Sequence, residues 1–151
     1  MADSKNPTPG EITILAAGAV ALIFSFFDFY KSASISVGNA TYGGGGISVW
    51  SSGLFPVATL MVIFVVIMAV VVALTRFGNV ALPDPPFALS WNQIHLMLGF
   101  FAALYALTWL IKSKGGVDFG IGFWFILIAC IAALVGAVLL QREVASAPPS
   151  A

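Results

Sequence analysis

The stretch LFPVATLMVIFVVIMAVVVAL occupies residues 54–74 and contains no charged side chain. Roughly 20 helical residues, at a rise of about 1.5 Å each, cross a hydrocarbon layer of about 30 Å. Backbone amides in lipid must be hydrogen-bonded within the chain, so such a stretch forms an α-helix. Three more apolar stretches of similar length occupy residues 12–29, 94–111 and 119–140. The sequence therefore predicts an all-α membrane protein, a four-helix transmembrane bundle over residues 12–142.

Composition excludes several other classes of protein. Of the 151 residues, 60% are hydrophobic and only 8% are charged, whereas soluble domains carry about 25% charged residues. Six basic residues balance six acidic ones, so nothing indicates a nucleic-acid partner. The single cysteine, Cys130, lies within the fourth stretch and suits a packing role. No cofactor is predicted, and residues 1–11 and 143–151 are expected to be a polar tail and a disordered tail.

The loop after the first stretch is predicted to form a β-hairpin within residues 32–50. Residues 32–37 and 47–50 alternate polar and apolar side chains, as a half-buried strand does. Four consecutive glycines, residues 43–46, lie between them and favour a turn. Tyr42 is then expected at the hairpin tip and Trp50 at its base, where both are candidates for partner binding. Trp50 equally suits an anchor at the membrane interface.

A few polar groups near the helix ends are candidates for a polar site. Asp28 precedes Lys31 by three residues, which would place both on one helix face as an interfacial pair, or as a proton or cation site. His95 falls in the first turn of the third stretch, where it suits interfacial hydrogen bonding, a ligand role or a proton relay. It has no second ligand nearby in sequence, so no metal site is predicted. Asp28 and His95 are expected on opposite membrane faces, so we predict no catalytic site and no enzyme.

Small residues form stripes on the third and fourth stretches. Gly99 and Ala103 face one way on the third, and Ala133 and Gly136 do so on the fourth. Such faces permit close helix contact, either within the bundle or with a partner or a second copy. The short loop between the two stretches predicts that they are antiparallel neighbours. The second stretch has no small-residue stripe and is predicted to be the most lipid-exposed.

Orientation is not decided by charge, because each side of a four-span bundle would hold three basic residues. They are Lys5, Arg76 and Arg142 on one side, and Lys31, Lys112 and Lys114 on the other. The polar hairpin is the largest loop, and we expect it outside the cell. This orientation puts both termini in the cytoplasm of a plasma-membrane, multi-pass protein.

Two segments carry a family resemblance: Phe-Phe-Asp-Phe-Tyr at 26–30 and Val-Trp-Ser-Ser-Gly at 49–53. The layout resembles small four-span actinobacterial membrane proteins, which have an aromatic cluster after the first span and a Trp-Ser-Ser-Gly-like stretch before the second. The proline typical of that cluster is absent here, and Asp28 stands near its place. The group is largely uncharacterised, so the resemblance implies a bacterial plasma membrane and no particular activity.

These patterns together predict a non-catalytic membrane subunit or accessory protein. It would bind a membrane-protein partner or lipid through the outer hairpin and the small-residue helix faces. The alternative is a homo-oligomeric channel or transporter component, although the second and fourth stretches carry almost no polar lining residues.

Overall fold

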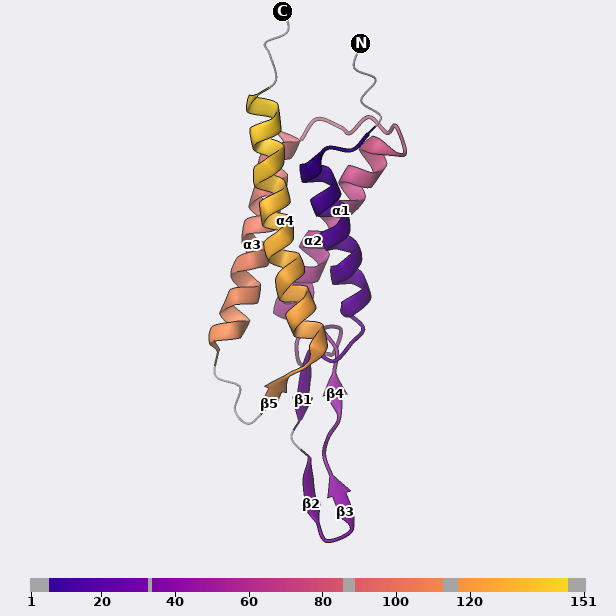
Figure 1. The fold of residues 1–151 in the computed structure, drawn as a ribbon, viewed down its shortest axis with the longest axis vertical. Coiled ribbons are helices and arrows are strands. Elements are labelled where there is room, and N and C mark those ends of the chain that lie inside the picture. The colour runs from indigo at the N-terminus through magenta and orange to yellow at the C-terminus, as the bar shows by residue number, and fades with distance from the viewer. Residues whose placement is uncertain (1–5, 33, 86–88, 113–116, 147–151) are drawn as a thin grey trace, which may run out of the picture.

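A computed structural model describes residues 6–32, 34–85, 89–112 and 117–146 of the chain. Within these ranges the chain is mostly helical, with four helices and five short strands (Figure 1). The helices are α1 (Pro9–Phe24), α2 (Val57–Arg76), α3 (Trp91–Ile111) and α4 (Ile121–Ala145). The strands are β1 (Tyr30–Ser32), β2 (Ile35–Val37), β3 (Ala40–Tyr42), β4 (Gly46–Ile47) and β5 (Val117–Phe119).

The helices form an antiparallel bundle in which each helix packs against two main neighbours. α1 lies against α2 and α4, and α3 also lies against α2 and α4, so the predicted contact between the third and fourth helices is confirmed. The first turn of α1 and the last turn of α4 share one end of the bundle, and the strands lie at the other (Figure 1). We call these the terminal end and the sheet end.

Three of the helices, α2, α3 and α4, are long and apolar enough to cross a membrane. α1 is shorter, with 16 residues. The prediction of one helix over 12–29 is wrong at its carboxyl end, because the chain leaves the helix after Phe24. The Phe27 amide bonds the Phe24 carbonyl in a tight turn, and the Phe29 amide then bonds Ile47 of β4 at 2.8 Å. The backbone at residue 29 thus belongs to the sheet.

Capping residues set where two helices begin. Thr8 caps α1 and shares a capping box with Glu11, so this helix starts within the predicted polar tail. Ser90 caps α3 and pairs in the same way with Gln93, which confirms the predicted cap. At the other end of the chain α4 continues to Ala145, into the predicted disordered tail. Residues 1–5, 33, 86–88, 113–116 and 147–151, which include parts of both predicted tails and most of the loop between the third and fourth helices, lie outside the described residues.

The loop strands form two separate units. β1 is the centre of a three-stranded sheet, with β4 on one side and β5 on the other. Tyr30 in β1 lies opposite Ile47 and Phe119, which ties the loop to the start of α4. β2 and β3 pair only with each other among the described residues and form a hairpin that extends beyond this sheet (Figure 1).

The hairpin turn is at Gly38 and Asn39, not at the predicted glycine run. Val37 pairs with Ala40, which leaves a two-residue turn, and Gly38 has a φ of +63°. Such tight turns favour glycine and asparagine because they need positive φ angles. The glycines at 43–46 instead connect β3 to β4. At the last of them, Gly46, the Asp28 carboxylate occupies the place of a Cβ, so a larger residue would displace that side chain.

The core runs along the bundle axis and includes much of α2. Met61, Val65 and Met68 of α2 are fully buried. Within the most apolar 18-residue stretch of each helix, the buried share is 28% in α3, 39% in α2 and 50% in α4. The prediction that the second helix is the most lipid-exposed is therefore wrong, and α3 is more exposed than α2. Uniform apolarity could not distinguish a lipid-facing side chain from a core one.

Candidate functional site

The four small residues proposed for partner binding lie inside the monomer. Ala133 is fully buried, Ala103 is 5% exposed, and Gly99 and Gly136 are also buried. A Cβ at Gly99 would come within 3.0 Å of the Cα of Leu134, so this glycine permits the close contact of α3 with α4. The core-packing interpretation of these residues therefore holds, and they offer no open surface.

Gly136 faces a different helix from the one predicted. A Cβ there would lie 2.7 Å from Ile14 Cγ1 and 3.0 Å from the Gly10 carbonyl oxygen, both in α1. A small residue on an apolar helix does not show which neighbour approaches it, so this contact could not be read from the sequence. Gly136 lets α1 and α4 approach closely near the terminal end.

Trp50 packs back onto the end of α1. Its indole Nε1 donates a hydrogen bond to Ser25 Oγ at 3.0 Å, and its ring stacks near Phe26. The side chain is 43% exposed, an arrangement that suits the interface-anchor alternative. Tyr42 is in β3 opposite Ile35 rather than at the hairpin tip, so its predicted position is wrong.

The three residues of the possible polar site form no hydrogen bond or ion pair with one another in the described part of the chain. Asp28 lies between α1 and β1, where its carbonyl oxygen accepts a hydrogen bond from the Gly122 amide at 3.0 Å. Lys31 is exposed in β1 opposite Asp118, so Asp28 and Lys31 do not share a helix face. His95 is in the first turns of α3, towards the terminal end of the bundle. The expected separation of Asp28 and His95 is thus a feature of the fold.

His95 is buried and makes one described hydrogen bond. Its ring Nδ1 lies 2.7 Å from the Trp91 carbonyl oxygen. A carbonyl only accepts, so Nδ1 is the donor in this hydrogen bond. Nε2 has no hydrogen-bond partner in the described part of the chain. Among the same residues no three potential ligands from His, Cys, Asp or Glu come together as a metal site.

Aromatic rings close the sheet end of the bundle. Phe29 is fully buried and makes edge-on contacts with Tyr30, Trp109 and Phe123. Phe119 of β5 stacks on Phe123 with ring centroids 3.8 Å apart. Burial raises the pKa of the Tyr30 hydroxyl above its usual value of about 10, so it remains neutral at physiological pH. These rings fasten the sheet to α3 and α4, and we call them the aromatic cluster.

Charged side chains join the helices at the terminal end. Glu11 is 8% exposed and forms an ion pair with Arg76 at the end of α2, with 2.5 Å between Oε1 and Nε. Glu143 of α4 accepts a hydrogen bond from the Gly10 amide at 3.1 Å. The sequence did not predict that these residues pair with one another. Their positions in the sequence could have indicated these contacts, because the end of one helix and the start of an antiparallel neighbour lie close together in space.

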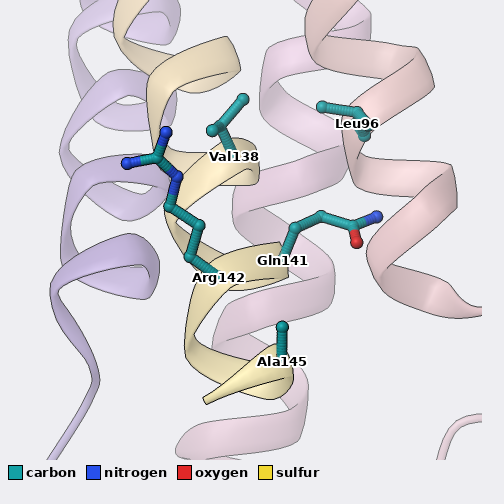
Figure 2. A pocket seen from close by; sticks show the side chains of 5 residues that line it. All are labelled: Leu96, Val138, Gln141, Arg142 and Ala145. Atoms are coloured by element: carbon teal, nitrogen blue, oxygen red, sulfur yellow. The ribbon is translucent and has the colours of Figure 1, made fainter.

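An open groove lies on the outside of the bundle between α3 and α4. One hollow of about 390 Å³ lies near the terminal end and is lined by Leu96, Val138, Gln141, Arg142 and Ala145 (Figure 2). A second hollow of about 410 Å³ shares Leu96 and is otherwise lined by Met97, Phe100, Phe101 and Leu134. The first hollow therefore has a polar edge, whereas all the side chains that line the second are apolar.

Comparison of the sequence with protein-family models gives no match, and comparison with curated proteins gives none either. The functional argument therefore rests on the surfaces of the structure. Two of these surfaces bear on function: the hairpin at the sheet end and the groove between α3 and α4.

Proposed function

We propose that this protein is a non-catalytic integral membrane subunit that binds a membrane-protein partner through the β2–β3 hairpin. In this proposal all four helices cross a bacterial plasma membrane. Both termini are cytoplasmic, and the hairpin lies on the outer face. The resemblance to four-span actinobacterial proteins and the opposite positions of hairpin and termini support this placement.

Exposed apolar side chains on the hairpin carry the proposal. Ile35 and Val37 of β2 are each 65% exposed and lie two residues apart, so they point to the same side of the strand. On the opposite side, the hydroxyls of Ser36 and Thr41 are 3.5 Å apart, at the limit of a hydrogen bond. The hairpin thus has one apolar and one polar side. An apolar side that projects from the bundle is a surface for another protein chain to cover.

The backbone of the hairpin offers a second means of contact. Among the described residues β2 and β3 pair only with each other, so each strand keeps one unpaired edge. Such edges bind an added strand through main-chain hydrogen bonds. The hairpin can therefore bind a partner strand at its edge while Ile35 and Val37 contact the partner's side chains.

The contacts of α1 support its placement in the membrane. Its 16 residues rise about 24 Å, somewhat less than a hydrocarbon core of about 30 Å. It packs against both α2 and α4, which are long enough to span. Ile12 and Ile23 on its outer side are more than half exposed. A helix with an apolar outer side beside two spanning helices is placed to face lipid along with them.

Site-specific photo-crosslinking tests the hairpin surface. We expect a photoreactive amino acid at Val37, in the full-length protein in its own membrane, to give one discrete crosslinked product. The matched control is the same group at Thr41, on the polar side of the hairpin, which should crosslink weakly. Equal crosslinking at both positions, or none at Val37, would contradict the proposal. A product of twice the monomer mass would favour the homo-oligomeric channel alternative.

A further inference from the structure

We propose that the groove between α3 and α4 is a binding site for one anionic phospholipid. The headgroup phosphate binds Arg142 and Gln141, and an acyl chain lies along the apolar part of the groove. This inference goes beyond the proposed function, because it concerns the opposite end of the bundle from the hairpin. It shares with that proposal only the placement of α3 and α4 in a bilayer.

The polar edge of the groove has the chemistry that a phosphate requires. The Arg142 guanidinium has no hydrogen-bond or ion-pair partner within the described part of the chain. Its planar fork of N–H donors matches the geometry of phosphate oxygens. Figure 2 shows Gln141 extending towards α3, while Arg142 extends along α4 towards Val138. The amide of Gln141 supplies further donors on the side of the hollow that faces α3.

Two acidic side chains near this end of the bundle contact partners other than Arg142. Glu143, the neighbour of Arg142 in sequence, accepts its hydrogen bond from Gly10 of α1. Glu11 forms its ion pair with Arg76. Neither carboxylate forms an ion pair with Arg142 in the described part of the chain. An anionic headgroup can supply the partner that Arg142 lacks among the described residues.

The position and length of the groove fit one leaflet of a bilayer. Arg142 lies about 30 Å along α4 from Ile121, which is about the hydrocarbon thickness, so it reaches headgroup level. From Arg142 to Leu134 the groove runs about 12 Å along the helix, close to half that thickness. Its deeper part includes Met97 and Phe100, which are 48% and 53% exposed. These side chains offer an apolar track for an acyl chain.

Native mass spectrometry of the full-length protein in detergent tests the site. Phosphatidylglycerol and phosphatidylcholine with the same acyl chains are titrated separately, and bound lipids are counted. We expect one phosphatidylglycerol to be retained in preference to phosphatidylcholine. Arg142→Gln should weaken that binding about tenfold, because a charge-assisted contact is lost. Val138→Trp should weaken it as well by filling the hollow while the charge remains.

Matched controls distinguish loss of the site from the general effects of removing a cation or adding a large side chain. Lys31→Gln removes an exposed cation at the sheet end, and Val135→Trp adds bulk to α4 away from the groove. Both should retain lipid as the unmodified chain does, and all four variants should keep its melting temperature without added lipid. Equal retention by Arg142→Gln and the unmodified chain would overturn the proposal.

A headgroup without acyl chains distinguishes a lipid site from a free-anion site. Glycerol 3-phosphate at the lipid concentration should leave the bound phosphatidylglycerol in place, since it cannot use the apolar track. Displacement would identify a simple anion site and contradict the lipid proposal. The hairpin plays no part in these measurements, so failure of the partner proposal and failure of this one give different results.

Discussion

The sheet end and the terminal end of the bundle are closed by different chemistry. At the sheet end, aromatic rings around Phe29 fasten β1 and β5 to α3 and α4. At the terminal end, Glu11, Arg76 and Glu143 join α1 to α2 and α4 through an ion pair and a hydrogen bond. Aromatic packing depends on side chains of complementary shape, whereas each charged group at the terminal end depends on a polar partner. The two ends should therefore respond differently to substitution.

The largest effect is expected at the aromatic cluster. Phe29→Ala removes a fully buried ring with three edge-on aromatic contacts, so we expect a loss of about 3–5 kcal/mol. The free energy of unfolding in detergent, from denaturant titration, measures it. The control is Phe26→Ala, which removes a ring that is 69% exposed. Similar losses for both variants would show that the cluster does not close this end.

A smaller effect is expected where α1 crosses α4. Gly136→Ala places a Cβ against Ile14 and the Gly10 carbonyl, at 2.7 and 3.0 Å, so the helices must separate at a cost of about 1–3 kcal/mol. Gly53→Ala is the control, because a Cβ there meets no atom within 4 Å among the described residues. The difference between the melting temperatures of these two variants measures the cost of crowding the contact between α1 and α4. A neutral Gly136→Ala would mean that α1 and α4 are further apart than the structure shows.

The ion pair at the terminal end should have the smallest effect. Glu11→Gln keeps a capping-box side chain but removes the charge opposite Arg76, which is 31% exposed, so we expect a loss of about 1 kcal/mol. Glu11→Ala loses the cap as well and should cost about 2 kcal/mol. Adding salt should reduce the difference in the free energy of unfolding between Glu11→Gln and the unmodified chain. Equal stability of Glu11→Gln and the unmodified chain would show that the pair contributes little.

The sequence supported some parts of this fold better than others. The three longest helices follow from apolar length alone, and the start of α3 follows from Ser90 and Gln93. The end of α1 did not, because Phe26, Phe27 and Phe29 continue the apolar run past the helix, and residue 29 instead pairs with β4. That pairing joins residues far apart in the chain. Local patterns cannot show it.

The candidate sites show the same limit. Small residues on α3 and α4 were recognised, but which helix each one contacts depends on the bundle, as Gly136 shows. The hairpin was recognised as well, but six glycines within residues 38–53 left its turn ambiguous, and only the pairing of Val37 with Ala40 resolves it. The groove at Arg142 needs two helices to form, so no single segment revealed it.

Cysteine accessibility tests the central claim, that α1 crosses the membrane and separates the hairpin from the terminal end. Cys130 is buried and is replaced by alanine, and single cysteines are then placed at Asn6, Thr41 or Asp84. We predict that an impermeant maleimide labels Thr41→Cys in intact cells, and labels Asn6→Cys and Asp84→Cys only after permeabilisation. Labelling of Asn6→Cys together with Thr41→Cys in intact cells would contradict the account, because α1 would then not cross.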